Sequence, residues 1–543
     1  MNGWHKLQRA IAREGKHFFT QLGNPGETQR RLLRQIVGRN RNSEFGRRFR
    51  FDAIQSVADY QSRVPLQCYE DLAPDIKRMA NAEQGILCEE TVIAFEETGG
   101  SSAGSKLIPY TRRSLAAFQQ ALHPWLDDLL RYRPGIMQGS TYWSISPALH
   151  RTTTTVGGIP IGLESDAAYF GSKLAAEISQ LLAVPPAVGR QHDFQNWRYL
   201  TLRYLLAAED LSLISVWSPT FLLDLVAALK RHHERLADDI AYGRIGIQLA
   251  EEGERLHPAL LQASPQRANE VLNACRGARV DCNRLWPRLD TLSCWLDSSA
   301  ARYRKQLDDL FPGVYIQGKG LLATEGVVSL PVVNARAPVL AINSGFYEFV
   351  DDRDRIHLAD ELQTDEVYRV VMSNFSGLFR YQLGDQIRVV DRLGATPLIE
   401  FVGRYGNVSD LCGEKLSEAF VQGQLSDVKG FALLLPSQAE RIGYRLVLDE
   451  SRYTEAEALQ VATQIDLQLA SNPQYAYARK LGQLAPLLPL RVASPWKQYL
   501  RYQCRRQRRL GDIKPVVLNQ DEGLLAKFMD HRQPPASESE SRC

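Results

Sequence analysis

The 543-residue chain is poor in cysteine and has almost no net charge. Its eight cysteines are scattered, and none forms a Cys-x-x-Cys pair, so we expect reduced thiols and a cytoplasmic protein. Lysine plus arginine number 65 and aspartate plus glutamate 62, which leaves a formal net charge of +3. This balance creates no long-range field toward nucleic acid or anionic lipid.

Long apolar runs and histidine clusters are also missing. The longest apolar stretch, residues 211–229, is interrupted by Pro219 and Asp224. It is too broken to span a membrane, and it predicts a buried strand over 211–217 followed by a helix with Ser218 at its N-cap. The first residues lead into charged side chains and not into an apolar signal core. The ten histidines show no metal-binding spacing.

The chain does contain a loop of small polar residues that ends in a lysine. The loop reads Thr98-Gly99-Gly100-Ser101-Ser102-Ala103-Gly104-Ser105-Lys106. Glycine lets a backbone approach a ligand closely, and consecutive N–H groups form an anion-binding nest to which hydroxyls add donors. A lysine supplies a compact positive charge. This composition predicts a polyphosphate site, and the alternative is a serine-glycine hairpin without a ligand.

The flanks of this loop argue against a P-loop NTPase. A Walker loop ends in Gly-Lys-Ser/Thr and opens directly into a helix, but here Ser105 separates Gly104 from Lys106, and Leu107 follows. Residues 92–95 and 107–110 are short, apolar and strand-like. The next helix begins only after Thr111, a good N-cap residue. We therefore expect strand, loop and strand.

The remaining pattern indicates a globular α/β protein with more than one domain. Hydrophobic residues make up 44% of the chain and charged residues 23%, which is ordinary for a globular protein. Helices are expected to about residue 90, then alternating strands and helices to about 240. Further helices are expected at 255–261, 268–275 and 291–310. Strands are expected at 314–317, 339–342, 346–350, 367–373, 387–390 and 398–402.

Several segments that follow the loop carry a family resemblance in their order and spacing. They are Ala323-Thr324-Glu325-Gly326, Phe379-Arg380-Tyr381-Gln382-Leu383-Gly384-Asp385, Gly403-Arg404 and Cys412-Gly413-Glu414-Lys415-Leu416-Ser417-Glu418. Together they resemble the acyl-adenylate-forming superfamily. The branch that the chain resembles is the auxin-responsive (Gretchen Hagen) acyl acid amido synthetases, in a bacterial-type form. That branch is indicated by Ser344-Gly345-Phe346-Tyr347-Glu348-Phe349 and by the segment 373–381.

The resemblance implies a fold and a reaction. It implies an α/β fold with a large multi-sheet N-terminal adenylation domain (1–402) and a small mobile α+β C-terminal domain (403–533, hinge at 403–413). The composition of residues 534–543 predicts a disordered tail. It implies an ATP- and Mg²⁺-dependent ligase that adenylates a carboxylic acid and transfers the acyl group to an amino acid or another amine. No membrane partner is expected, nucleic acid is disfavoured, and a monomer is favoured.

By the same resemblance, particular residues would hold the nucleotide. The loop residues Thr98, Gly99, Gly100, Ser101, Ser102, Ala103 and Gly104 would hold the phosphates. Lys106 would be their counter-charge. Thr324 would contact the α-phosphate, Glu325 would bind Mg²⁺, Asp385 and Arg404 would reach the ribose, and Tyr347 would lie near the adenine. Each has an ordinary alternative: a turn residue at Glu325 and Asp385, a core tyrosine at Tyr347 and a surface arginine at Arg404.

Two lysines compete for the catalytic role, and the acid site is the least defined. Lys415 matches a family lysine that faces the nucleotide, and Lys514 resembles the superfamily lysine that bridges carboxylate and α-phosphate. Plain solvation is the alternative for both. The acid-binding candidates are the apolar residues Tyr142, Trp143, Ile145, Val216 and Trp217, which suit a hydrophobic acid. We expect about half of them to be core residues.

Two other functions compete with amide synthesis. An acyl-CoA ligase shares the adenylate and differs only in its thiol acceptor. A nucleic-acid- or nucleotide-binding protein would use the basic run Arg501, Arg505, Arg506, Arg508 and Arg509, with Tyr499 and Tyr502 interleaved. The near-neutral chain favours a solvated helix for this run.

Overall fold

The chain divides into two compact units. The computed structural model describes residues 3–98, 106–143, 153–163, 169–191, 193–247, 261–406, 408–437, 441–506 and 513–530. The first unit holds residues up to Trp295 together with Gln306–Phe401, and the second holds Leu296–Lys305 and the residues from Val402 onward. The inclusion of the segment 296–305 in the second unit was not expected from the sequence.

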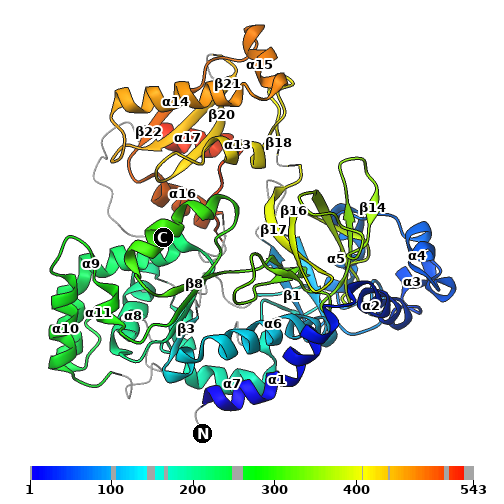
Figure 1. Ribbon diagram of the computed structural model, residues 1–543, viewed down its shortest axis with the longest axis horizontal. Coiled ribbons are helices and arrows are strands. Elements are labelled where there is room, and N and C mark those ends of the chain that lie inside the picture. Colours follow the sequence, from blue (N-terminus) through cyan, green and yellow to red (C-terminus); the bar gives the residue numbers. More distant parts are fainter. Residues whose placement is uncertain are drawn as a thin grey trace. The chain divides into compact units, whose positions relative to one another are not determined.

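The first unit begins with helices and a small sheet that carries the polar loop (Figure 1). The helices are α1 (Gly3–Gln21), α2 (Pro25–Arg39), α3 (Glu44–Arg48), α4 (Val57–Arg63), α5 (Tyr69–Ala80) and α6 (Arg112–Tyr132). The strands, in sheet order, are β2 (Lys106–Tyr110), β1 (Ala94–Thr98), β5 (Pro160–Ile161) and β4 (Thr153–Thr154). Thr111 caps α6, because its side chain accepts a hydrogen bond from the N–H of Ser114. Helix α1 packs beside α6.

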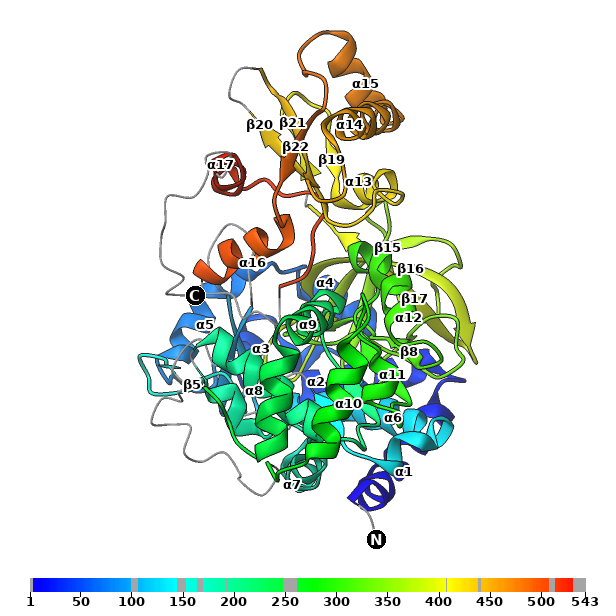
Figure 2. The same ribbon diagram turned by 90° about the vertical axis from the view of Figure 1, so that its left-hand side faces the viewer.

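A parallel sheet forms the second layer of this unit. Its strands, in order, are β3 (Thr141–Trp143), β6 (Leu213–Ser215), β7 (Thr291–Cys294) and β8 (Tyr315–Gly318). The associated helices are α7 (Ser172–Leu181), α8 (Phe194–Ala207), α9 (Pro219–Tyr242), α10 (Pro265–Cys275), α11 (Cys282–Leu285) and α12 (Arg304–Leu310). Figure 2 shows α9 packed between α8 and α10.

One sequence prediction in this region is wrong. Residues 291–310 were expected to be one helix, but Thr291–Cys294 is the buried strand β7. Four buried apolar and hydroxyl residues are too few for periodicity to separate a strand from a helix, and pairing with β6 and β8 decides the outcome. The segment 255–261, expected to be helical, lies outside the described residues.

A seven-stranded sheet completes the first unit. Its order is β11 (Ser329–Leu330), β12 (Val339–Leu340), β17 (Thr396–Arg404), β16 (Tyr381–Leu393), β15 (Val367–Ser373), β13 (Phe346–Val350) and β14 (Ile356–His357). A separate two-stranded ribbon, β9 (Leu322–Ala323) with β10 (Gly326–Val327), turns at Thr324 and Glu325.

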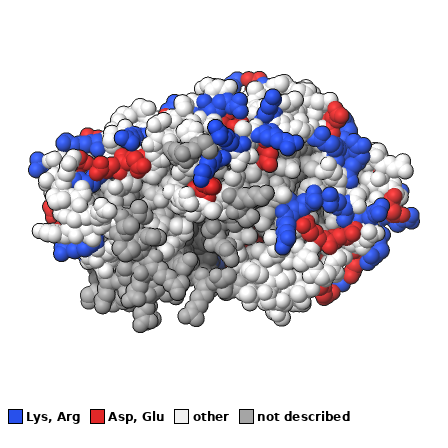
Figure 3. Space-filling model, turned by 90° about the horizontal axis from the view of Figure 1, so that it is seen from below, with Lys and Arg blue, Asp and Glu red and all other residues white. Residues whose placement is uncertain are grey.

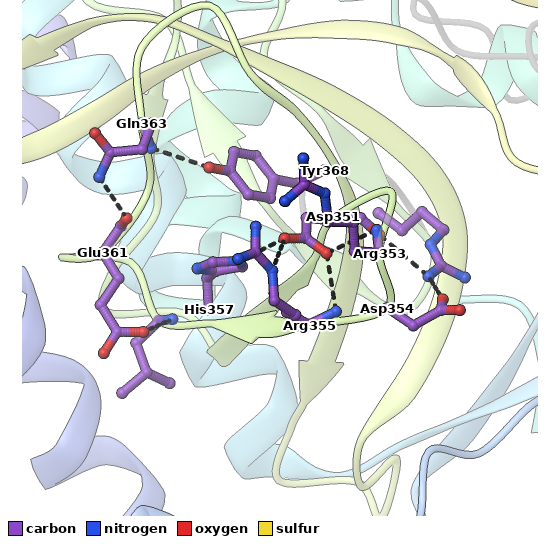
Figure 4. Close-up of polar contacts among 10 residues, drawn as sticks. Asp351, Arg353, Asp354, Arg355, His357, Glu361, Gln363 and Tyr368 are labelled. Atoms are coloured by element: carbon purple, nitrogen blue, oxygen red, sulfur yellow. Dashed lines mark hydrogen bonds and ion pairs between the residues drawn. The ribbon is translucent and has the colours of Figure 1, made fainter.

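The turn between β13 and β14 is organised around a buried aspartate (Figure 4). The Asp351 carboxylate accepts hydrogen bonds from the N–H groups of Arg353 at 2.9 Å and Arg355 at 2.8 Å, and from Arg355 Nε at 2.7 Å. His357 Nε2 lies 3.0 Å from the same carboxylate. Burial raises the pKa of this carboxyl, but hydrogen bonds from His357 and Arg355 lower it, and its net pKa lies well below the ordinary value.

The second unit is a small α+β arrangement. Its strands are β18 (Val408–Ser409), β19 (Leu416–Ser417), β20 (Ala432–Ser437), β21 (Gly443–Asp449) and β22 (Leu488–Val492). Its helices are α13 (Glu418–Gln424), α14 (Glu455–Leu469), α15 (Pro473–Lys480), α16 (Pro495–Arg505) and α17 (Glu522–Asp530). Alternate residues of β20 and β21 bury leucines against α14, which gives this unit a hydrophobic core of its own.

Candidate active site

The polar loop is held between two paired strands. Strands β1 and β2 are antiparallel, with Thr98 opposite Lys106, so both ends of the loop lie next to each other. This agrees with the expected strand, loop and strand. The residues between them, 99–105, lie outside the described residues, so their role in phosphate binding stays a prediction. The side chain of Thr98 is likewise not described.

Lys106 is already engaged by the start of α5. Its Nζ lies 3.6 Å from Glu70 Oε1 and 5.0 Å from the ring centre of Tyr69. The backbone N–H of Leu107 donates to the Tyr69 hydroxyl at 2.9 Å. The side chain of Lys106 is 27% exposed and that of Glu70 is 65% exposed, so a phosphate group can compete with Glu70 for the ammonium group at little cost.

The turn at Thr324 and Glu325 is tied to two other predicted segments. The Tyr110 hydroxyl, at the end of β2, donates to the carbonyl of Thr324. Asn374 Nδ2 donates to the carbonyl of Glu325 at 2.9 Å, and the Tyr381 hydroxyl donates to Glu325 Oε1 at 3.4 Å. Burial, followed by the Glu325 charge, raises the pKa of Tyr381 well above its ordinary value, so the phenol stays a neutral donor to this carboxylate.

The Mg²⁺ role of Glu325 stays a prediction, and its surroundings agree with it. Its side chain is half-buried and accepts a hydrogen bond from the Tyr381 hydroxyl. Mg²⁺ bound to a nucleotide usually takes one or two carboxylates, with phosphate oxygens and water as its other ligands. Within the part of the chain that the structure describes, no group of three or more His, Cys, Asp or Glu side chains could hold a metal ion. One glutamate therefore fits a metal held chiefly by the triphosphate.

Asp385 lies in a bulge of β16. Gln382 pairs with Val371 and Gln386 with Arg369, so three residues of β16 stand opposite one residue of β15. Gly384 has φ +77° there, a conformation that glycine adopts without penalty. Bulges redirect side chains and are common beside active sites. The sequence placed Asp385 at the start of a strand, whereas it is the fifth residue of β16 and is 4% exposed.

A short segment before α5 connects β16 to β2. The N–H of Gln67 donates to the carbonyl of Arg380, and the N–H of Gln382 donates to the carbonyl of Gln67, both at 2.9 Å. Two residues later, Tyr69 contacts both Lys106 and Leu107. The strand that carries Asp385, the Glu325 turn and the end of the loop therefore belong to one connected region of the first unit.

The surroundings of Tyr347 are those of a core tyrosine, which was the alternative to its predicted place near the adenine. It is 0% exposed, its hydroxyl lies 2.7 Å from Ser344 Oγ, and it donates to the carbonyl of Val327. Burial raises its pKa above the ordinary value. With the whole side chain covered and its hydroxyl bonded inside the chain, Tyr347 offers no surface to an adenine ring.

In the second unit, Lys415 lies in a loop that is held by hydrogen bonds to the neighbouring Glu414. The Glu414 carboxylate, 0% exposed, accepts from the N–H groups of Leu411 at 2.8 Å and Cys412 at 2.7 Å and from the Tyr444 hydroxyl. Lys415 then takes φ +47° and its side chain is exposed. The sequence analysis quoted Glu414 only as part of a motif and missed that it positions the lysine. No composition signal marks this role, because Tyr444 lies 30 residues away.

The other candidates in the second unit are exposed. Arg404 ends β17 and Lys514 follows the buried Ile513 in an irregular segment. That segment continues to Val517, whose carbonyl accepts from the N–H of Leu434 at 2.8 Å, so it lines the edge of β20. Their roles stay predictions.

The acid-binding candidates separate onto two faces of the parallel sheet. Successive residues of a strand point to opposite faces, so Tyr142 and Trp143 cannot line one pocket. Tyr142 is 1% exposed and belongs with the buried core, as does Val216 at 1%. Trp143 stacks on Phe170, with ring centres 4.7 Å apart. Trp217 is half-buried, and Ile145 lies outside the described residues.

The structure adds a residue that the sequence analysis missed. Lys319 follows β8 and is only 8% exposed. Its Nζ donates to Ser215 Oγ at 2.9 Å and lies over the rings of Trp125 at 5.5 Å and Trp217 at 5.3 Å. The only sequence signal is a lysine directly after an apolar strand, which is too common to single it out.

In the described part of the basic run near the C-terminus, Arg501 and Arg505 are exposed and Arg506 is engaged within the second unit. Arg506 pairs with Asp521 and its guanidinium lies 5.7 Å from the ring centre of Tyr502, whose hydroxyl donates to Asp521 at 2.9 Å. Arg508 and Arg509 lie outside the described residues. On the face seen in Figure 3, basic and acidic side chains are interspersed. That this run is only a solvated helix stays a prediction.

Comparison with known proteins identifies the family. The model of the GH3 family N-terminal domain matches residues 15–316, more than half of the chain, and the model of the GH3 family central domain matches residues 338–404. The chain belongs to the GH3 family. The resemblance found in the motifs is thereby confirmed.

Relatives extend over most of this GH3 protein. Indole-3-acetic acid-amido synthetase GH3.4 of Arabidopsis thaliana is 23% identical over 442 residues, which are 77% of this chain and 73% of that protein. Indole-3-acetic acid-amido synthetase GH3.8 of Oryza sativa subsp. indica is 25% identical, covering 78% and 73%. The solved structure of the GH3.15 acyl acid amido synthetase in complex with 2,4-DB has a TM-score of 0.85 at 19% identity and covers 96% of both chains.

These findings settle the fold class and the enzyme class. The expected α/β fold, with a large multi-sheet first part and a smaller α+β second part, is confirmed. The protein is an ATP-dependent ligase of the adenylate-forming, amido-synthetase type. Among the described helices, none is both long and apolar enough to cross a membrane.

Proposed function

We propose that this GH3 protein joins a hydrophobic carboxylic acid to an amino acid through an acyl-adenylate, in the cytoplasm. The observation that carries the proposal is the connected region described above. Tyr110, Tyr69 and Tyr381 tie the end of the polar loop, the Glu325 turn and the strand that carries Asp385 to one another. These are three segments that a bound nucleotide must reach at once.

In the first step, one acid oxygen attacks the α-phosphorus of ATP. A bond forms between them, the bond to the bridging oxygen breaks, and pyrophosphate leaves. Two unit negative charges about 4 Å apart repel by about 4 kcal/mol at an effective dielectric of 20. In the proposal, Lys106 and the N–H groups of residues 99–105 offset this repulsion. Mg²⁺ held at Glu325 would neutralise further phosphate charge.

The Asp385 carboxylate is suited to the ribose. A carboxylate accepts hydrogen bonds only, and a ribose diol offers two donors. At 4% exposure the carboxylate is largely desolvated, so hydrogen bonds to it are strong. Asp385 directly follows the bulge residue Gly384 and is buried in phase with Leu383 and Ile387.

In the second step the amine nitrogen attacks the acyl carbon and AMP leaves. The C–N bond forms, the C–O bond to AMP breaks, and the amine loses a proton to water or to a nearby carboxylate. Lys415, held by Glu414, and Lys514 are the candidates of the second unit for contact with the nucleotide. We place the hinge of that unit at 403–413, where Gly406 and Gly413 have φ of +84° and +90°.

The test is an acid panel scored by acid-dependent exchange of pyrophosphate into ATP. Active acids are then offered amino acids or coenzyme A in separate reactions, and products are identified by mass spectrometry. The proposal predicts exchange with hydrophobic acids and amides as products. Thioesters without amides would establish the acyl-CoA ligase instead. Absence of acid-dependent exchange, together with tight RNA or DNA binding at physiological salt, would contradict the proposal.

A further inference from the structure

Four side chains form one row across the parallel sheet. Strand register places Trp143 beside Ser215, Ser215 beside Ser293 and Ser293 beside Gln317. Side chains in register on neighbouring parallel strands share a face. Lys319, two residues beyond Gln317, donates to Ser215 Oγ at 2.9 Å. We call these five residues the polar row.

The polar row contains buried donors without partners. Trp143 Nε1, Ser293 Oγ and Gln317 Nε2 are covered and make no hydrogen bond, although Trp143 is 8% exposed, Ser293 0% and Gln317 4%. Buried polar atoms are nearly always bonded, and an orphaned one costs about 1–3 kcal/mol. A ligand that accepted hydrogen bonds from these three atoms would remove this cost.

The three groups without partners have the same chemical character, because an indole N–H and an amide NH₂ donate only and a hydroxyl can donate. Lys319, which is already bonded to Ser215, adds a positive charge to the row. The amide oxygen of Gln317 is already used, because Trp125 Nε1 donates to it at 2.9 Å. The excess of donors and the positive charge match an acceptor-only, anionic group, which is the character of a carboxylate.

The surroundings fit the remainder of a hydrophobic acid. The rings of Trp125 and Trp217 flank Lys319 Nζ, and Phe170 stacks on Trp143. The row lies at the carboxyl ends of parallel strands, where ligands bind in α/β sheets. Lys319 and Trp143, each 8% exposed, are the members of the row through which a carboxyl group would approach.

We propose that the polar row, with Lys319 as its cation, binds the carboxylate of the acid substrate and afterwards the carbonyl oxygen of the acyl-adenylate. This inference rests on the proposed function and assigns the acid a subsite separate from the phosphate loop. Lys319, Ser215, Ser293 and Gln317 become acid-binding residues, and Trp143 keeps the acid-binding role predicted from the sequence.

The test measures binding of the best acid of the panel without ATP, by isothermal titration calorimetry. Lys319→Met is expected to weaken binding about 10- to 100-fold, the range for hydrogen bonds to charged groups. It should leave the KM for ATP within about twofold in the exchange reaction, since Lys106 and Asp385 are intact. The primary amide of the same acid should bind the wild type more weakly than the acid, and Lys319→Met should abolish that difference.

Ser293→Ala keeps the proposal testable if Lys319→Met does not fold. This change removes an orphaned hydroxyl, so the thermal midpoint is expected to stay the same or rise while acid affinity falls about threefold or more. A purely structural serine would lose stability and not affinity. Tyr204→Phe is the matched control, because it deletes another buried hydroxyl without a partner in α8, and it should leave both quantities unchanged.

The outcomes separate this inference from the proposed function. If folded Lys319→Met or Ser293→Ala binds the acid as tightly as the wild type, the polar row does not bind the acid and the inference is wrong. The proposed ligase activity still holds in that case if the wild type catalyses acid-dependent exchange. A raised KM for ATP with unchanged acid binding assigns the row to phosphate and also overturns the inference. If the wild type shows no exchange with any acid, the proposed function fails and the acid subsite fails with it.

Discussion

The Asp351 turn and the polar row are both buried and polar, but they differ in how their groups are matched. At Asp351, one carboxylate receives two backbone N–H groups, a guanidinium and an imidazole, all from the same turn (Figure 4). In the polar row, three donors have no acceptor. A closed cluster stabilises the fold without a ligand, whereas the three donors grouped in the polar row are the basis of the acid site that we propose.

This difference predicts that buried ion pairs within the fold affect stability and that the site affects activity. The largest loss of stability is expected for Glu348→Gln. Glu348 and Arg380 form an ion pair of 3.0 Å with both side chains buried, although Arg380 Nη2 has no partner, and removing one charge of such a pair costs about 3–5 kcal/mol. Chemical denaturation measures the free energy of unfolding. Asp360→Asn, which breaks the exposed pair with Arg30, is the control with a much smaller effect.

Asp385→Ala should impair nucleotide binding strongly and stability only slightly, the reverse of what Glu348→Gln is expected to do. Loss of charge-assisted hydrogen bonds to the ribose is expected to raise the KM for ATP about 10- to 100-fold, with a much smaller loss of stability than Glu348→Gln causes. Steady-state exchange and thermal unfolding on the same preparation measure both. An unchanged KM for ATP would remove Asp385 from the nucleotide site, and unfolding of the variant would place it with the closed clusters.

Gly384→Ala tests whether one change at the bulge of β16 lowers stability and weakens ATP binding together. No atom lies within 4 Å of a Cβ built at Gly384, so only the backbone at φ +77° resists the change. That conformation costs a non-glycine residue about 1–2 kcal/mol. We expect this loss in the free energy of unfolding together with a raised KM for ATP, because Gly384 directly precedes Asp385 and a shift of its backbone moves that carboxylate. Gly482→Ala, also at positive φ in open space and outside the proposed hinge, controls for strain alone.

Asp351→Asn should have the smallest effect, and one that depends on pH. The folded-state pKa of Asp351 is lowered, so its contribution is fully present above the unfolded pKa of about 4 and is lost as pH falls toward the folded pKa. The thermal midpoint of the variant should lie a few degrees below the wild type at pH 5–8, and the gap should narrow progressively as the pH falls below about 4. A gap independent of pH would contradict the closed ionic cluster.

The sequence revealed local features and missed those that depend on register. Thr111 at the start of α6 and Ser218 before α9 were predicted from cap and proline signals and stand where expected. Strand β7 was mistaken for a helix because its four residues are decided by neighbouring strands. The polar row cannot be recognised in the sequence, because its members come from four strands and the residue after β8, and the first and last of them are 176 residues apart (143 to 319).

The same limit applies to individual site residues. Asp385 was found because it lies in a continuous motif, but its bulge was not, because the bulge appears only when β15 and β16 are paired. Tyr347 was assigned to the nucleotide by resemblance, while its complete burial follows from packing that the motif does not encode. Residues that act through distant partners, such as Glu414 with Tyr444, need the folded structure.

The proposed reaction depends most on which product receives a carboxyl oxygen of the acid. An active acid labelled with ¹⁸O in its carboxyl group, incubated with ATP and the amine, transfers one labelled oxygen to AMP if the carboxylate attacks the α-phosphorus. We predict labelled AMP and unlabelled pyrophosphate, measured by mass spectrometry. Label in inorganic phosphate, or AMP free of label, would contradict an acyl-adenylate and with it the site built from Lys106, Glu325 and Asp385.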